Sequence, residues 1–185
     1  MIKQAKIKER QIAKRRRLEL QTPDAATELI RHFPANKFRG ASIGGFWPLP
    51  SELDVRPLLS ALSEFGFEIS LPCCSEKSQP LIFREWAPGD KLQLGPFQVQ
   101  EPHKEKKKST PTLVLVPLLA FTPEGQRLGY GGGYYDRTLA ELRSLGDVFA
   151  CGVAYAGQEV SHLPTDEHDQ RLDGILTEQY FRAFA

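Results

Sequence analysis

The sequence lacks any long hydrophobic run. Its longest apolar stretch, residues 113–121, is interrupted by Pro117 and falls short of the roughly 18 residues that a membrane span needs. The first residues also lack the apolar centre of a secretory signal. We therefore expect a cytoplasmic protein with no membrane partner. Its 185 residues are typical of one domain, so a single domain over residues 1–185 is expected.

Cysteine is scarce, and this disfavours two further classes of protein. Cys73, Cys74 and Cys151 are odd in number and form no C-x-x-C pair, so neither a disulfide framework nor a zinc site is expected. Free cysteines pack like small hydrophobic residues, and we predict buried or idle thiols. His162 and His168 are six residues apart with no convincing third ligand, so they are predicted to make local hydrogen bonds instead of binding a metal.

The net charge of +1 conceals a strongly basic N-terminal segment. Residues 1–17 contain eight basic residues and one acidic residue, so they carry +7 and the rest of the chain carries −6. Residues 2–20 contain neither glycine nor proline and are rich in good helix formers, which predicts a helix. A basic helix can hold the phosphates of a nucleic acid or of a nucleotide, and composition leaves both alternatives open.

Helical and strand patterns alternate along the chain. The continuous apolar run at 113–117 is typical of a strand that is covered on both faces. Alternation of this kind predicts an α/β fold with a largely parallel sheet. The predicted helices cover residues 2–20, 24–32, 51–66 and 134–145. The predicted strands cover residues 40–47, 67–71, 81–86, 113–117, 148–155 and 174–176, with a short one around 97–99.

A glycine-rich segment between a predicted buried strand and a predicted helix carries the clearest chemical pattern. Without side chains, successive backbone N–H groups can surround a phosphate, and the start of the following helix favours an anion. Arg127 offers a forked cation for phosphate oxygens, and Asp136 offers a carboxylate that suits magnesium. The segment is neither a Walker loop nor a dinucleotide fingerprint, and a tight turn without a ligand is the alternative. Its glycines are Gly129, Gly131, Gly132 and Gly133, and its tyrosines, whose faces could contact a ring, are Tyr130, Tyr134 and Tyr135.

The run from Arg127 to Arg137 closely resembles the signature of the 5-formyltetrahydrofolate cyclo-ligase family, also called methenyltetrahydrofolate synthetases. The resemblance extends over nearly the whole chain. One position departs from it: the family usually has Asp after the phenylalanine at 121, and this chain has Thr122. The further matching segments, in order, are Lys6 to Arg10, Trp47 to Asp54, Leu71-Pro72, Gly95 to Phe97, Glu101-Pro102, Val114 to Pro117 and His168 to Asp173.

The resemblance implies a fold, a reaction and its ligands. The fold would be a three-layer α/β sandwich like that of sugar-phosphate isomerases and CoA transferases, with residues 1–20 packed on or near the nucleotide site. The reaction would use ATP and Mg²⁺ to convert 5-formyltetrahydrofolate to 5,10-methenyltetrahydrofolate, ADP and phosphate. The formyl oxygen would be phosphorylated, and N10 of the same folate would displace the phosphate. The partners would be a folate substrate and ATP, with no nucleic acid, and the protein would be a monomer or a weak homodimer.

The resemblance also implies residue roles. Lys6 and Arg10, which share a helix face at i and i+4, would contact ATP phosphates, whereas residues 14–17 are interpreted as surface charge. Arg127 and Tyr134 would be catalytic, and Asp136 and Asp173 would bind the metal. The nucleotide site would comprise Lys6, Arg10, Arg127, Leu128, Gly129, Tyr130, Gly131, Gly132, Gly133, Tyr134 and Tyr135. The folate site would comprise Trp47, Glu52, Tyr130, Gly131, Gly132, Gly133 and Tyr134.

Simpler readings of several residues remain open at this point. Glu52 could be an acid at a helix start, Trp47 a core residue and Asp173 a turn residue. The basic run at 104–108 is either a solvated loop or a contact for a polyglutamate tail. At the level of the whole protein, the alternatives are a related ATP-dependent ligase acting on another formylated or amide-bearing pterin-like substrate, and a nucleic-acid binder that uses the basic helix.

Overall fold

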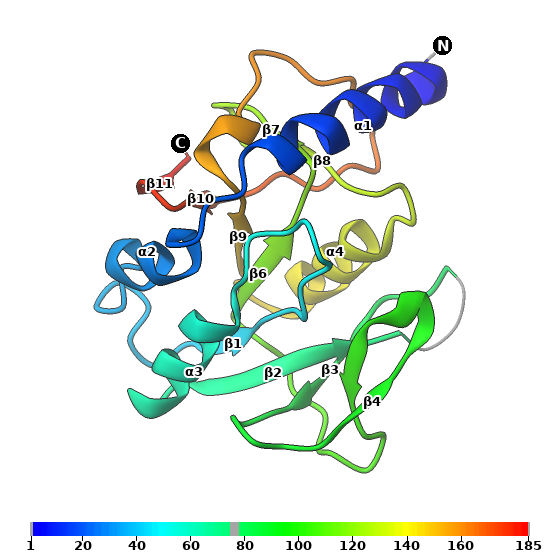
Figure 1. The fold of residues 1–185 in the computed structure, drawn as a ribbon. Helices are drawn as coiled ribbons and strands as arrows, with labels where there is room; N and C mark the ends of the chain where they lie inside the picture. Colours follow the sequence, from blue (N-terminus) through cyan, green and yellow to red (C-terminus); the bar gives the residue numbers. More distant parts are fainter. Residues whose placement is uncertain (1, 75–77, 185) are drawn as a thin grey trace.

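The computed structural model of the protein describes residues 2–74 and 78–184, and these residues form a seven-stranded sheet with the order β11-β10-β9-β6-β1-β2-β3 (Figure 1). The pairs β10–β9, β9–β6, β6–β1 and β1–β2 are parallel. The outer strands β11 and β3 are antiparallel to their neighbours. The predicted α/β fold with a largely parallel central sheet is therefore confirmed.

The helices and strands have the following bounds. The helices are α1 (Ile2–Glu19), α2 (Ala25–His32), α3 (Arg56–Glu64) and α4 (Tyr134–Leu145), with 3₁₀ turns η1 (Pro96–Gln98) and η2 (Ala156–Gln158). The central sheet contains β1 (Ser42–Gly44), β2 (Glu68–Cys73), β3 (Ile82–Glu85), β6 (Leu113–Pro117), β9 (Phe149–Val153), β10 (Gly174–Leu176) and β11 (Phe181–Ala183). Two small hairpins lie outside it: β4 (Leu92–Leu94) with β5 (Gln100–Pro102), and β7 (Ala120–Phe121) with β8 (Arg127–Leu128).

Both faces of the sheet are covered by helices. Strand β6 shows the alternation most clearly, because Leu113 and Leu115 belong to the core beneath α2 and α3, whereas Val114 and Val116 belong to the core beneath α4. All four side chains are fully buried, as the continuous apolar run predicted. Figure 1 shows α2 and α3 on one side of the sheet and α4 on the other. Helix α1 lies apart from these layers, beside β7 and β8.

Several predicted boundaries were wrong. The helix predicted over 51–66 begins only at Arg56, with Pro57 in its first turn, and residues 51–55 form a turn and loop. Strand β2 continues through Pro72 to Cys73, because its pairing with β1 ends at Ser70 and no β1 partner needs the missing N–H of Pro72. The strand predicted around 97–99 is instead η1, and strands lie on either side of it.

The order of the strands locates a natural binding site. From β1 the chain moves outward in one direction to β2, then returns to β6 on the other side of β1 and continues to β9 and β10. Strands β1 and β6 therefore flank the point where the winding direction reverses. In open α/β sheets, ligands bind beyond the carboxyl ends of the strands at such a point.

Candidate functional site

A cavity of about 1280 Å³ lies at this switch point. Its lining includes Phe46 and Trp47, which follow β1, together with Pro72 at the end of β2 and Pro117 at the end of β6. The glycine-rich segment after β8 and one face of α1 also line it. Small-molecule sites usually measure roughly 300–1,000 Å³, so this cavity is large enough for more than one small ligand.

The glycine-rich segment forms a loop that side chains would obstruct. Gly131 and Gly133 have φ angles of 101° and 66°, in the left-handed region that favours glycine. Helix α4 begins directly afterwards, at Tyr134. A Cβ atom at Gly131 would also lie 3.0 Å from Cζ of Arg10. The glycines thus allow both the loop conformation and the close approach of α1.

Helix α1 presents a row of basic side chains to the cavity. The Lys6 Nζ atom donates hydrogen bonds to Asp166 at 2.7 Å and to Asp169 at 2.6 Å. Burial alone would lower the pKa of Lys6, but these two carboxylates outweigh it and raise the pKa. Arg10 Nε donates to the carbonyl of Gly129 at 2.9 Å. Lys6 and Arg10 therefore both line the cavity, and Arg10 contacts the glycine loop.

Glu52 is buried in the cavity wall and has several partners. It is 9% exposed; its Oε1 accepts a hydrogen bond from the Tyr130 hydroxyl at 2.7 Å, and its Oε2 accepts one from the Leu49 N–H at the same distance. Burial raises the pKa of Glu52, against the lowering effect of these bonds and of the Arg17 charge. Burial and the nearby Glu52 charge raise the pKa of Tyr130. Glu52 precedes α3 and does not cap it, so its position is that of a site residue.

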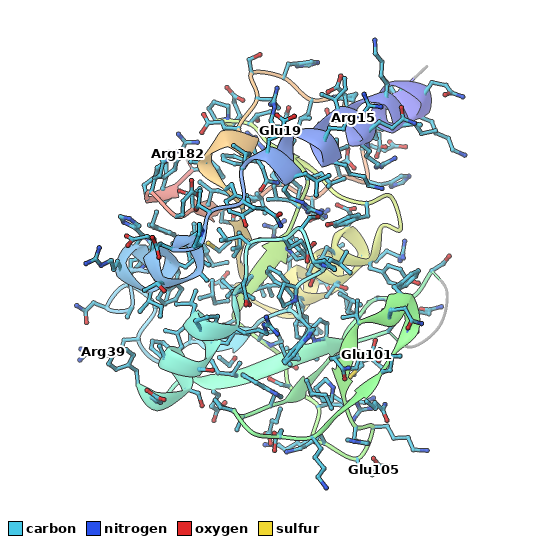
Figure 2. The ribbon with its side chains drawn as sticks, in the orientation of Figure 1. Arg15, Glu19, Arg39, Glu101, Glu105 and Arg182 are labelled. Atoms are coloured by element: carbon cyan, nitrogen blue, oxygen red, sulfur yellow. The ribbon has the colours of Figure 1, made fainter. Side chains whose placement is uncertain are left out.

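Arg17 corrects the sequence-based interpretation of residues 14–17 as surface charge. Arg17 is only 3% exposed, whereas Arg15 and Arg16 are exposed on α1 (Arg15 is labelled in Figure 2). The reason is helical spacing: Lys6, Arg10 and Arg17 lie at i, i+4 and i+11, on the face of α1 that points into the molecule. That spacing was visible in the sequence, but the run of four basic residues concealed it.

Of the two predicted metal ligands, one lines the cavity. Asp136 lines the cavity, where its Oδ1 accepts bonds from Arg127 Nη2 at 2.6 Å and from the Gln170 N–H at 3.0 Å. Asp173 is not among the lining residues, and its Oδ2 accepts bonds from Arg143 and from the Ala150 N–H. Within residues 2–74 and 78–184, no three His, Cys, Asp or Glu side chains form a group that could hold a metal.

The other predicted site residues line the cavity. They are Trp47, Arg127, Leu128, Gly129, Gly132, Tyr134 and Tyr135. Trp47 packs edge-on against Trp86, with 6.5 Å between ring centroids. The Arg127 side chain is 4% exposed. Burial raises the pKa of Tyr135, so its hydroxyl stays protonated at neutral pH.

Sequence reasoning missed several residues that also line the cavity. Asp166 and Asp169, which hold Lys6, come from a loop whose path the sequence did not predict. Phe97 lies in the unexpected 3₁₀ turn, 66% exposed, with its ring 5.8 Å from that of Tyr134. Glu101 is 4% exposed on β5 (Figure 2), and its Oε1 accepts the Cys74 N–H. Burial raises the pKa of Cys74 to about 11, so it is not an activated thiol.

Two features singled out in the sequence lie away from the cavity lining. Thr122, where the family usually has Asp, is fully buried in the turn between β7 and β8, and its hydroxyl accepts the Gln126 N–H at 3.3 Å. An aspartate could accept the same bond, so the substitution preserves a turn contact. In the basic run at 104–108, Lys106 pairs with Asp90 and Lys107 with Glu85, and no residue of this run lines the cavity.

The fold and site together define a class of protein. A cationic helix face, a glycine loop and a helix start meet at the switch point of a parallel sheet, which is typical of α/β enzymes that bind phosphate-bearing ligands. Among the described residues, no helix has the length and apolar character of a membrane span. The three cysteines are free thiols in the described structure.

Comparison with known proteins identifies the family. The model of the 5-formyltetrahydrofolate cyclo-ligase family matches residues 2–178. The Escherichia coli K12 5-formyltetrahydrofolate cyclo-ligase is 31% identical over 158 residues, covering 83% of this chain and 85% of that protein. The chain therefore belongs to the 5-formyltetrahydrofolate cyclo-ligase family, which confirms the recognition made from its motifs and the assignment as an enzyme of this kind.

Solved structures agree with this assignment. The structure of the Aquifex aeolicus 5,10-methenyltetrahydrofolate synthetase superposes with a TM-score of 0.78 at 26% identity, covering 96% of this chain and 92% of that one. The Mycoplasma pneumoniae 5,10-methenyltetrahydrofolate synthetase superposes with a TM-score of 0.69 at 21% identity, covering 94% and 98%. The second likeness supports the fold alone.

Proposed function

We propose that the protein converts 5-formyltetrahydrofolate to 5,10-methenyltetrahydrofolate with hydrolysis of ATP to ADP and phosphate. One observation carries the proposal beyond family membership. A single cavity of about 1280 Å³ is lined both by a phosphate-type site, made of α1 cations and the glycine loop, and by a ring-type site, made of Trp47, Glu52 and Tyr130. Both substrates would therefore meet in one cavity.

The nucleotide would occupy the side formed by α1 and the loop of residues 127–135. Lys6, Arg10 and Arg127 would contact phosphate oxygens, and the backbone N–H groups of the loop would add neutral donors. Lys6 is held by Asp166 and Asp169, and Arg127 by Asp136. When ATP binds, its phosphates would replace these carboxylates as the partners of Lys6 and Arg127. The cations are thus kept in place and paired before ATP binds.

The folate would occupy the side formed by Trp47, Glu52, Tyr130 and Tyr134. An ionised Glu52 can accept hydrogen bonds from the amino and ring N–H groups of a pterin. Trp47 and Tyr134 offer flat faces for the rings. The loop glycines 131–133 would let the formyl group approach the nucleotide closely, because no side chain would separate the two substrates.

The chemistry needs placement and charge neutralisation more than a protein nucleophile. The formyl oxygen attacks the γ-phosphorus of ATP, the bond to the β-phosphate oxygen breaks, and ADP leaves. N10 of the same folate then attacks the formyl carbon and closes the ring, the C–O bond to the phosphate breaks, and the N10 proton is lost to solvent or to the departing phosphate. Arg127 would neutralise charge on the transferring group, and Tyr134 would orient the formyl end.

Magnesium would be held by Asp136 together with the ATP phosphates. A hard cation that takes one or two carboxylates and completes its shell with phosphate and water fits the position of Asp136 in the cavity lining. When bound, magnesium would neutralise phosphate charge. Asp173 does not fit as a direct ligand, because it is not among the lining residues and it already accepts bonds from Arg143 and Ala150.

The related ligase and the nucleic-acid binder are weaker alternatives. Of the basic residues on α1, Lys6 and Arg17 are buried and Arg10 is half-buried against the glycine loop. Lys6 and Arg10 line the cavity, and none of these three cations belongs to an exposed face for a nucleic-acid backbone. A ligase for another substrate would share the nucleotide side and differ around Trp47 and Glu52.

Absorbance of the methenyl product tests the proposal. Purified protein with 5-formyltetrahydrofolate should form it only when ATP and magnesium are both present, and Arg10→Ala should raise the KM for ATP. Other formylated pterins should turn over far more slowly. A protein that binds ATP but forms no methenyl product would be the related ligase; a protein that binds neither ligand would contradict the proposal altogether.

A further inference from the structure

Arg17 is a buried cation whose contacts converge on the folate side of the cavity. Its Nη2 donates to the Ser51 hydroxyl at 2.6 Å, and its Nη1 donates to the Leu118 carbonyl at 3.3 Å. The guanidinium carbon lies 5.4 Å from the centroid of the Tyr130 ring. Nη1 also lies 3.8 Å from Oε1 of Glu52. One side chain on α1 therefore touches the residue before Glu52, the ring that bonds Glu52, and the carboxylate itself.

These contacts match those of a second cluster that lies elsewhere in the fold. Arg182 on β11 pairs with Glu159 at 2.8 Å, lies 5.3 Å from the centroid of the Tyr180 ring, and Tyr180 donates its hydroxyl to Glu159 at 2.9 Å (Arg182 is labelled in Figure 2). None of these three residues lines the cavity. The fold thus groups an arginine, a glutamate and a tyrosine twice, but the Arg182–Glu159 pair is closer and more exposed than the Arg17–Glu52 pair.

Burying an arginine is unfavourable unless its charge makes a compensating interaction. Removing a guanidinium from water costs several kcal/mol, and a hydrophobic residue could pack α1 against the turn at 49–52 without that cost. A hydrophobic residue could not, however, place a positive charge beside the Glu52 carboxylate. One charged group faces Glu52, Arg17 from α1. The neutral donors are the Tyr130 hydroxyl from the glycine loop and the Leu49 N–H from its own turn, and the titratable Tyr135 at the start of α4 also interacts with the Glu52 charge.

We propose that Arg17 is a positioning residue for folate: it holds the Glu52 carboxylate and the Tyr130 ring side by side, so that both meet the substrate in one orientation. The inference rests on the proposed folate-binding role of Glu52. Arg17 itself would not touch ATP, because it lies about two turns beyond Arg10 along α1 and, unlike Lys6 and Arg10, is not among the residues that line the cavity.

The proposal has a consequence for pH dependence. Burial raises the pKa of Glu52, while the Leu49 N–H, the Tyr130 hydroxyl and the Arg17 charge lower it. Without Arg17 the pKa of Glu52 rises further, so Glu52 becomes protonated at a higher pH. A protonated Glu52 cannot accept two bonds from the pterin. Folate binding should then fail at a higher pH in the variant than in the wild type.

The experiment compares Arg17→Met with two controls. Arg15→Met removes an exposed charge from the same helix, and Arg182→Met disrupts the matched cluster away from the cavity. For Arg17→Met we expect the KM for 5-formyltetrahydrofolate to rise about tenfold or more, as for loss of a buried charged contact, with the KM for ATP changed less than about twofold. The acid limb of the folate KM profile should move to higher pH. Both controls should keep wild-type KM values.

Other outcomes would overturn the proposal. If the KM values for folate and ATP rise together in Arg17→Met, Arg17 only anchors α1. If neither KM rises, Arg17 only fills space between α1 and its neighbours and has no role in folate binding. Should Arg17→Met not fold, Arg17→Lys, which retains the charge, should keep the wild-type acid limb. The double variant Arg17→Met with Glu52→Gln, which buries no unpaired charge, should have the folate KM of Glu52→Gln alone; an additive increase would refute coupling. Absence of turnover in the wild type would instead refute the proposed function.

Discussion

Removing one hydroxyl group, in Tyr130→Phe, tests the geometry of the folate side. Glu52 accepts hydrogen bonds from Tyr130 at 2.7 Å and from the Leu49 N–H, and the variant leaves Oε1 facing only Arg17 at 3.8 Å. A hydrogen bond to a charged group contributes about 1.5–3 kcal/mol to folding. Because Tyr130 is 38% exposed, water can replace part of this bond. We therefore expect the unfolding free energy to fall by about 1.5 kcal/mol, near the low end of that range.

The stability loss in Tyr130→Phe should depend on pH, and its direction follows from the protonation state of Glu52 that the Tyr130 hydrogen bond stabilises. The Tyr130 hydroxyl stabilises ionised Glu52, so the destabilisation should be full above the pKa of Glu52 and should shrink as the pH falls through it. Misplacement of the carboxylate should also raise the folate KM about tenfold, the equivalent of roughly 1.4 kcal/mol.

Thermal or urea unfolding at several pH values, with steady-state kinetics, measures both effects. Tyr180→Phe is the matched control, because it removes the corresponding bond to Glu159 outside the cavity lining. It should lower stability to a similar extent without changing KM. A Tyr130→Phe enzyme with wild-type folate KM would refute the view that the Tyr130–Glu52 bond prepares the site.

Four further outcomes are expected. The folate KM of the wild type should rise as the pH falls through the raised pKa of Glu52, and Glu52→Gln should flatten that profile. Lys6→Met should raise the KM for ATP about tenfold and leave the folate KM unchanged, which initial-rate kinetics would show. Asp136→Ala should lower the free energy of unfolding by about 3 kcal/mol, because it leaves the buried Arg127 charge unpaired. Urea denaturation measures this change, and Asp136→Asn should lower the free energy of unfolding by less. Gly152→Ala should lower the free energy of unfolding by about 1–3 kcal/mol, since the new Cβ would lie 2.7 Å from side-chain atoms of Ile175 and Leu172.

The sequence predicted the elements whose pattern is strong and local. The apolar run at 113–117 and the helix at 134–145 lie within one residue of their predictions, because burial on two faces and helical composition leave clear periodic signals. The helix at 51–66 was placed too early, since Ser51 and Glu52 resemble a helix start but accept hydrogen bonds from Arg17 and Tyr130 instead of capping the helix. Strand β11, at Phe181–Ala183, was missed because it has a charged residue at its centre and is only partly buried, so it gives no apolar run like that of β10.

The parts of the candidate site that lie within one short segment of sequence were predictable, whereas contacts between residues far apart in the sequence were not. The glycine loop and Arg127 were visible as one motif. The pairing of Lys6 with Asp166 and Asp169 joins residues some 160 positions apart, and no local signal announces it. Arg17 could have been found by extending the Lys6 and Arg10 spacing by another two turns of helix. The position of Asp173 relative to the cavity depends on how β10 joins the sheet, which no motif encodes.

The ratio of phosphate released to methenyl product formed tests the central claim most directly. If one cavity activates the formyl oxygen with ATP and then closes the folate ring, the wild-type enzyme should release one phosphate for each methenyl group formed, throughout the reaction and at every ATP concentration. Methenyl product without phosphate, or phosphate released continuously without methenyl product, would contradict the account.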